Sequence, residues 1–242
     1  MNAETQMGLY GKLPAYGDFL VRNLSAEFIN PWDEWLQHFI AGSKEQIGEN
    51  WLDIYLTSPV WHFTLSPGVI DSKTWAGVIM PSVDRVGRYF PVSIVKPFAS
   101  SVCPVSFMHD QHAWFNELEK HCLDALDGRI DVDELIEITT GIEISLRQDY
   151  QPTYHLGETG PMLIGLSTSD PIQINNAVGY LLDAALTANL KSFSLWQTAG
   201  SELIGPVIFS CQGLPPIGGI ASMMDGKWQE RNWKIPFNLQ MA

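Results

Sequence analysis

The spacing of apolar positions changes along the chain, from the period of a helix to that of a strand and back. The clearest helical stretch follows Asn30, a residue type that caps helix starts, and Pro31, which suits a first helical position. From Trp32 to Ile40, large apolar side chains recur at helical spacing and share one face. The pattern predicts an amphipathic helix over residues 30–47 that lies on a sheet.

Strand signals surround this helix. A short apolar run over residues 8–13 precedes it and ends at a proline. Residues 60–65 alternate in the manner of a half-buried strand, because every second side chain is large and apolar. Residues 75–80 are continuously apolar, as in a central strand covered on both faces, and another apolar run spans residues 90–95. The last three runs predict a meander of neighbouring strands.

The second half continues the alternation. Helical spacing predicts helices over residues 105–126 and 170–190. Between them, Asp131 with Glu134 resembles a capping box, which indicates the start of another helix. In the helix over residues 170–190, the expected buried face consists of Ile174, Val178, Leu181, Leu182 and Ala185. Further strands are expected over residues 162–166, 192–196 and 207–211.

No internal repeat or long linker divides the chain, and helices and strands interleave throughout. This organisation predicts one domain over residues 1–242 with an α/β fold. We expect a single mixed β-sheet with helices on both faces, which is a three-layer αβα sandwich.

Composition narrows the classes of function. The 242 residues carry a formal net charge of -13, so the surface should repel nucleic acid and anionic lipid, which are bound through Lys and Arg. No apolar run approaches the roughly 18 residues that span a bilayer, and the first residues lack the pattern of a signal peptide. We therefore expect a cytoplasmic protein that neither binds nucleic acid nor inserts into a membrane.

Metal-binding and catalytic motifs are incomplete. Cys103, Cys122 and Cys211 have no CxxC spacing, so they match neither a zinc ligand set nor a disulfide framework. His109 and His112 lie one helical turn apart, a geometry used by some metal sites, but no further ligand motif completes the shell. A metal-dependent phosphate hydrolase built on these histidines stays open as an alternative. The expected protein is not an enzyme and holds no metal or cofactor.

Residues 84–88 form the most pointed polar feature of the first half. Asp84, Arg85 and Arg88 follow a buried strand in a chain with few basic residues, and Gly87 permits tight backbone geometry. A pair of guanidinium groups suits an acidic or phosphate-bearing partner. The alternative is that Asp84 pairs with one arginine and only fixes the loop.

Several segments together resemble a known family. They are residues 11–19 (GKLPAYGDF), 32–36 (WDEWL), 51–61 (WLDIYLTSPVW) and 77–91 (GVIMPSVDRVGRYFP). In order and spacing they resemble the type VI secretion-associated TagF family, also called ImpM, over most of residues 8–96. Residues 97–242 resemble it more loosely, through 194–196 (SLW) and 213–215 (GLP).

The resemblance implies a cytoplasmic protein that represses type VI secretion post-translationally by binding and sequestering the forkhead-associated (Fha) scaffold protein. Other type VI components are further candidate partners. The alternative is an assembly or chaperone-like component of the apparatus, and loss of such a component would lower secretion instead of raising it.

The family offers no catalytic residues to transfer, so the candidate site is a protein-binding surface. Its expected residues are Asp84, Arg85 and Arg88, followed by Lys12 and Asp18. Two loops that carry them could converge at one edge of the sheet. The alternative is a buried ion-pair network that fixes the fold and contacts no partner.

Overall fold

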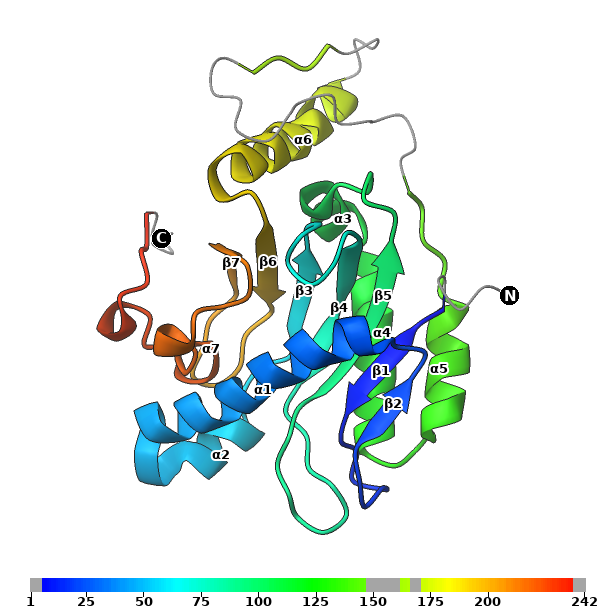
Figure 1. The fold of residues 1–242 in the computed structure, drawn as a ribbon, viewed down its shortest axis with the longest axis vertical. Coiled ribbons are helices and arrows are strands. Elements are labelled where there is room, and N and C mark those ends of the chain that lie inside the picture. Colours follow the sequence, from blue (N-terminus) through cyan, green and yellow to red (C-terminus); the bar gives the residue numbers. More distant parts are fainter. Residues whose placement is uncertain (1–5, 147–161, 166–170, 237–242) are drawn as a thin grey trace.

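A computed structural model describes residues 6–146, 162–165 and 171–236 of the chain, without the side chains of residues 171–176 (Figure 1). Its described strands form one sheet in the order β2-β1-β5-β4-β3-β6-β7. They are β1 (Gly8–Gly11), β2 (Leu20–Arg22), β3 (Trp61–Leu65), β4 (Thr74–Met80), β5 (Val92–Phe98), β6 (Phe193–Thr198) and β7 (Val207–Gln212). The predicted meander is confirmed, since β3, β4 and β5 are neighbours.

Helices cover both faces of this sheet. They are α1 (Ala26–Ile47), α2 (Trp51–Leu56), α3 (Pro104–Asp110), α4 (His112–Leu126), α5 (Val132–Thr140), α6 (Pro171–Leu190) and α7 (Ser222–Asp225). Short 3-10 turns lie at Gly48–Asn50, Ile217–Gly219 and Gln229–Arg231. The predicted fold class, α/β with one sheet between two helical layers, is confirmed.

The strand directions differ in one respect from the mixed sheet that interleaved helices and strands predict. Every pairing between the described strands is antiparallel. The helical connections explain this, because neither long crossover joins neighbouring strands. β2 leads through α1 and α2 to β3, with three strands between them in the sheet, and β5 leads through the later helices to β6, which pairs with β3.

Helix α1 covers one face of the sheet with aromatic rings (Figure 1). The predicted buried side chains Trp32, Trp35, Leu36 and Phe39 are confirmed. The predicted start at Asn30 and Pro31 is wrong, since the helix begins at Ala26 and Pro31 lies inside it. The reason is Phe28, whose fully buried ring lies 4.2 Å from that of Trp75 and extends the buried face by one turn.

Helices α3, α4 and α5 cover the opposite face. The helix predicted over residues 105–126 is divided into α3 and α4 at Gln111, whose backbone leaves the helical region with φ -104° and ψ 33°. The buried Gln111 amide donates a hydrogen bond to the Ser145 carbonyl at 2.7 Å, which holds the break in place. The helix predicted from Asp131 is confirmed as α5, because the Asp131 carboxylate caps its first turn.

Helix α6 matches the range predicted for it, but three of the five residues of its predicted buried face are exposed, while Ala185 is partly buried and the side chain of Ile174 lies outside the described part of the chain. Val178, Leu181 and Leu182 are 62%, 37% and 47% exposed. A different face of the helix packs on the core, with Ala177 and Ala184 buried and Tyr180, Leu186 and Leu190 partly buried. On this face α6 approaches α3 closely, because a Cβ atom on Gly179 would lie only 3.0 Å from the Ser106 hydroxyl.

Three remaining predictions concern strands. Those over residues 192–196 and 207–211 are confirmed as β6 and β7, which extend the sheet beyond β3. The strand over residues 162–166 is not found at 162–165, where the backbone forms no regular element, and residue 166 lies outside the described residues. Nothing in the described structure pairs with that segment as a strand.

Candidate functional site

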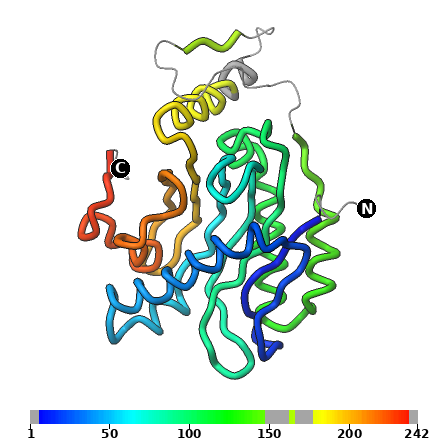
Figure 2. Tube along the Cα trace, in the orientation of Figure 1, coloured from blue at the N-terminus to red at the C-terminus, as the bar shows by residue number. Residues whose placement is uncertain are grey.

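Two loops meet at the end of the sheet where β1 and β4 finish. One is the turn between β1 and β2, and the other is the long connection between β4 and β5, which lies beside it in Figure 2. They contribute residues that stand 72 positions apart in the sequence, Lys12 and Asp84. The expectation that the two loops converge at one edge is therefore met.

The Asp84 carboxylate is the centre of this contact. Its side chain is fully buried, and its Oδ2 accepts hydrogen bonds from Lys12 Nζ at 2.9 Å and from Arg88 Nε at 2.6 Å. Its Oδ1 accepts from the backbone N–H groups of Val86 at 3.0 Å and of Arg88 at 2.8 Å. Both carboxylate oxygens are thus fully occupied inside the protein.

These bonds determine the charge state of Asp84. Burial alone would raise the pKa of Asp84. Four hydrogen bonds outweigh burial and hold this pKa well below its usual range. The donors are the Arg88 backbone, the Lys12 ammonium, the Arg88 guanidinium and the Val86 backbone. Asp84 is therefore ionised at neutral pH and forms a buried ion pair with Lys12. Such a pair fixes geometry more surely than it adds net stability.

The tip of the β4–β5 connection is a tight turn built on the same aspartate. The Asp84 backbone pairs with the Arg88 carbonyl, and Gly87 N–H donates to the Asp84 carbonyl at 3.0 Å. Gly87 has a φ of +85°, a conformation that side chains other than glycine rarely adopt. Arg85, Val86 and Arg88 are exposed in this turn, although Arg88 Nε reaches back to the buried carboxylate.

Two further hydrogen bonds fasten this tip to the β1–β2 turn. The Arg85 backbone N–H donates to the Tyr16 carbonyl at 2.8 Å, and Arg88 Nη2 donates to the Gly17 carbonyl at 2.6 Å. Below them, Ser82 Oγ donates to the Lys12 carbonyl at 2.6 Å. The two loops therefore form one rigid unit.

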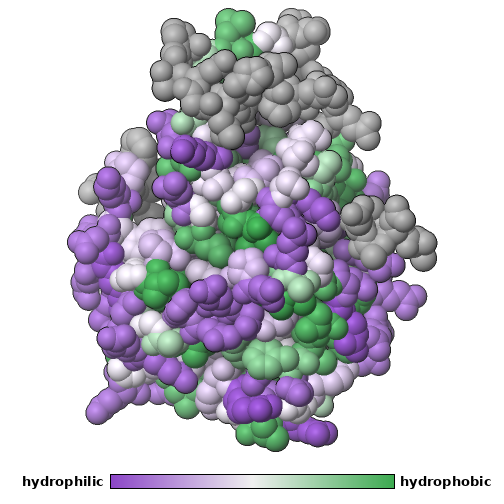
Figure 3. All heavy atoms as spheres, in the orientation of Figure 1, coloured by the Kyte–Doolittle hydropathy of each residue, from purple (hydrophilic) through white to green (hydrophobic). Residues whose placement is uncertain are grey.

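The outward surface of this unit mixes cations with apolar side chains. Val86 is 66% exposed, Phe19 is 43% exposed, and more than half of the Arg88 side chain is exposed. In Figure 3 a hydrophobic group protrudes beside hydrophilic ones at the lowest point of the molecule, where Figure 1 shows this connection. The buried Lys12 ammonium lies 4.7 Å from the centre of the Phe19 ring and supports it from inside.

The five predicted site residues thus divide into two groups. Lys12 and Asp84 are buried and can only position the loops, whereas Arg85, Arg88 and Asp18 reach solvent. Asp18 accepts one hydrogen bond, from the backbone of Phe19, and takes no part in the ion-pair network of the described residues. Binding of a protein by this surface stays a prediction.

Sequence reasoning missed four contributors, which are Tyr16, Gly17, Phe19 and Val86. All four lie in the two segments that resemble the family, so the signal was present in the sequence. What the sequence did not supply was the contact between the segments, because their hydrogen bonds join residues that are far apart along the chain.

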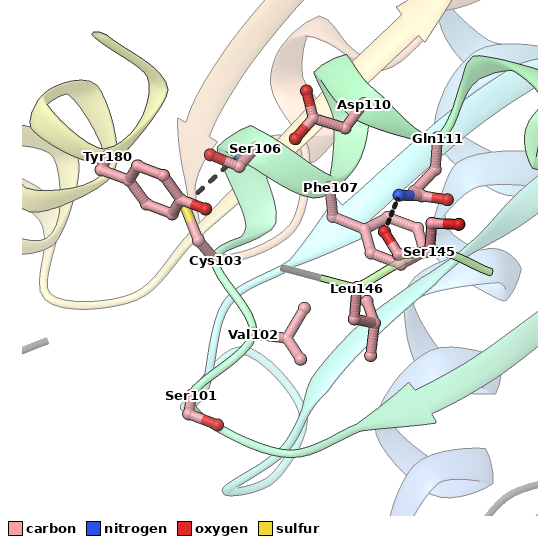
Figure 4. A pocket seen from close by; sticks show the side chains of 10 residues that line it. All are labelled: Ser101, Val102, Cys103, Ser106, Phe107, Asp110, Gln111, Ser145, Leu146 and Tyr180. Carbon is pink, nitrogen blue, oxygen red and sulfur yellow. Dashed lines mark hydrogen bonds between the residues drawn. The ribbon is translucent and has the colours of Figure 1, made fainter. Parts of the chain in front are cut away.

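Two concave places lie elsewhere, around α3. A small pocket of about 30 Å³ lies among α3, the segment before it and Tyr180 of α6, and Figure 4 shows Gln111 bonded to Ser145 at one side of it. A larger apolar groove of about 440 Å³ separates α3 from α6 over the end of the sheet, with Leu195 and Ile208 in its floor. The rings of His109 and His112, 6.0 Å apart, line this groove.

Metal and thiol chemistry find little support in the part of the chain that the structure describes. No three His, Cys, Asp or Glu side chains gather there as a metal site would require. Burial raises the pKa of Cys103 to about 12 and that of Cys211 to about 11, and it also raises the pKa of Cys122, so these thiols are protonated at neutral pH. Among the described helices, none has the length and apolar character needed to cross a bilayer.

Comparison with known proteins identifies the family. The family model of the TagF N-terminal domain, described as type VI secretion system-associated, matches residues 8–140, which include both loops of the site. No curated protein matches the chain. The crystal structure of PA0076 from Pseudomonas aeruginosa PAO1 is similar, with 30% sequence identity and a TM-score of 0.75, over 98% of this chain and 100% of that chain. The chain therefore belongs to the type VI secretion system-associated TagF family.

Proposed function

We propose that this protein represses type VI secretion post-translationally in the cytoplasm by binding and sequestering the Fha scaffold protein. The binding surface is the outward face of the two joined loops, formed by Arg85, Val86, Arg88, Phe19 and Asp18. Family membership supports the association with type VI secretion.

The observation that carries the proposal is the rigid display of exposed cationic and apolar groups. The Asp84 carboxylate accepts hydrogen bonds from the backbone of its own turn, so the tip of the β4–β5 connection is held in one conformation before a partner binds. Side chains that are ordered in advance lose less conformational entropy on binding. Arginine with neighbouring aromatic or aliphatic groups is also the composition favoured at the centre of protein interfaces.

The proposed activity is binding and not catalysis. The described residues bring together no nucleophile with an activating base, and the cysteine thiols have raised pKa values. A surface that grips another polypeptide needs only shape, charge and rigidity, which the joined loops supply.

A capture experiment tests the proposal. Immobilised wild-type protein should retain purified Fha protein, and Arg85→Ala should retain at least about fivefold less, since hot-spot truncations cost over 1 kcal/mol. Lys120→Ala is the matched control, because it also removes one exposed cation but lies on α4. Equal capture by wild type and Arg85→Ala would count against this surface, and absence of capture by wild type would count against the function.

A secretion assay tests the direction of the effect. Deletion of the gene should raise type VI secretion, and overproduction should lower it. An assembly or chaperone-like component would give lower secretion on deletion, so that result would replace repression by the alternative function.

A further inference from the structure

Two guanidinium groups converge on one glycine at the tip of the joined loops. Arg88 Nη2 donates to the Gly17 carbonyl, and the Arg85 guanidinium lies over the same residue, with Nη2 only 3.3 Å from the position that a Cβ atom on Gly17 would occupy. Like charges that are held together repel each other, so this arrangement has an energetic cost. An anion between the guanidinium groups would remove that cost.

Most of the N–H donors of this pair are unused. Arg88 donates through Nε to Asp84 and through Nη2 to Gly17, while its Nη1 group donates to none of the described residues. The Arg85 guanidinium forms no hydrogen bond or ion pair with any residue in the described part of the chain. Exposed, planar donors of this kind match the two oxygens of a carboxylate or the oxygens of a phosphate.

We propose that Arg85 and Arg88 form a clamp over Gly17 that binds a carboxylate side chain of an acidic peptide segment, with Val86 and Phe19 contacting an apolar neighbour of that carboxylate. The inference rests on the proposed function, because the segment would belong to the protein partner. It adds the chemistry of the contact, which the binding surface alone does not specify.

The surroundings favour a carboxylate over a phosphate. Asp18 is exposed in the same turn, and the whole chain carries a formal net charge of -13. A phosphate group with nearly two negative charges would meet more repulsion from this field than a carboxylate with one. Of the two cationic groups of the clamp, Arg88 already forms an ion pair with Asp84, so less positive charge is left for a ligand.

Gly17 provides a test that leaves every charge in place. Its φ is not in the left-handed region, so alanine is tolerated by the backbone, but the added Cβ would lie 3.3 Å from Arg85 Nη2, and the guanidinium would have to shift slightly from its place over Gly17. Gly17→Ala should therefore weaken anion binding without a change in net charge. Gly218→Ala is the matched control, since a Cβ atom there meets nothing within 4 Å.

The probes are three short peptides that differ at one position, Leu-Glu-Leu, Leu-Gln-Leu and Leu-phosphoserine-Leu, each blocked at both ends. NMR titration of the arginine side-chain Nε–H signals should show saturable shifts with the glutamate peptide. The glutamine peptide should bind wild type at least about fivefold more weakly than the glutamate peptide does. Arg85→Ala should weaken binding of the glutamate peptide by a similar factor, Gly17→Ala should weaken it less, and Gly218→Ala should match wild type. Melting temperatures of all variants should confirm that they are folded.

The outcomes separate the clamp from the proposed function. Equal shifts with the glutamate and glutamine peptides, or unchanged binding in both Arg85→Ala and Gly17→Ala, would overturn the clamp. Tighter binding of the phosphoserine peptide would overturn the choice of a carboxylate. If the clamp binds the glutamate peptide but wild-type protein does not capture Fha, the proposed function fails while the clamp stands. If the glutamate peptide binds but Fha is captured equally by wild type and Arg85→Ala, the clamp is not the contact with Fha.

Discussion

Replacement of Trp35 by alanine tests the packing of the aromatic layer under α1. Trp35 is 5% exposed, and its ring centre lies 5.1 Å from that of Trp32 and 5.5 Å from that of Trp196. Its Nε1–H donates to the Pro215 carbonyl at 3.1 Å. Truncation removes the buried ring, leaves a cavity and strands that carbonyl, so we expect a loss of about 3 to 5 kcal/mol in the free energy of unfolding.

Urea unfolding followed by tryptophan fluorescence and circular dichroism measures this loss. Trp35→Phe is an intermediate variant, because it keeps most of the burial but leaves the Pro215 carbonyl without its donor, which should cost about 1 to 2 kcal/mol. Leu182→Ala is the matched control on a second helix. Leu182 is 47% exposed, so its truncation should cost less than about 1 kcal/mol.

Two results would refute this reasoning. A loss below about 1.5 kcal/mol in Trp35→Ala would mean that the ring is not part of a packed layer. A loss in Leu182→Ala as large as that in Trp35→Ala would mean that α6 buries the face that its apolar spacing predicts, and that the exposed side chains described above are covered.

Three further predictions follow from the charges and thiols. Asp84→Asn should lower the free energy of unfolding at pH 7, as measured by urea titration. Because the pKa of Asp84 in the folded protein lies below the ordinary value of 3.8, the difference from wild type should shrink as the pH falls through and below 3.8. A difference that stays constant with pH would contradict the ion pair. The buried Cys103 thiol, with its pKa raised to about 12, should react more slowly with a disulfide reagent at pH 8 than the partly exposed Cys211 until urea unfolds the chain. Rapid reaction of Cys103 in the native protein would disprove its burial. Arg22→Ala removes an exposed ion pair to Asp133 and should change stability by less than about 1 kcal/mol, so a larger loss would mean that this pair is buried.

Hydrophobic spacing located most elements but not their limits. The face of α1 was predictable because Trp32, Trp35 and Leu36 share a helical stripe. Its start was not, because Asn30 and Pro31 are good start signals and only the tertiary contact of Phe28 with Trp75 overrides them. A cap signal is worth about 1 kcal/mol, which is less than the burial of a phenylalanine ring.

The face of α6 could not be predicted from spacing alone. Its apolar residues recur at helical intervals, as in a helix that packs by its large side chains. The structure shows contact through Gly179 and Ala184, together with the partly buried Tyr180 and Leu186. Leu182 lies in the wall of an open groove. Small residues make close helix contacts without any strong signal in a hydrophobicity pattern, so this choice depends on the neighbouring helix.

The charged residues of the candidate site were predictable, but its other contributors and the division of roles were not. A basic pair in an acidic chain pointed to residues 84–88, and the segment at residues 11–19 resembled the family. Only the fold distinguishes the charges that are buried from those that are exposed, because the ion pair joins Lys12 to Asp84 across 72 positions.

That division explains why a buried ion pair and exposed arginines occur in one loop. A buried pair gains little net stability over apolar replacements, so its value lies in the geometry that it imposes. Here Asp84 binds the backbone of its own turn and Arg88 Nε, while Lys12 ties the turn to the neighbouring strand. The consequence is a short loop with few accessible conformations, in which the Arg85 guanidinium and the apolar tip are oriented before binding. Rigidity of this kind lowers the entropy cost of association, so the proposed clamp would need only a small surface for selective contact with an acidic segment.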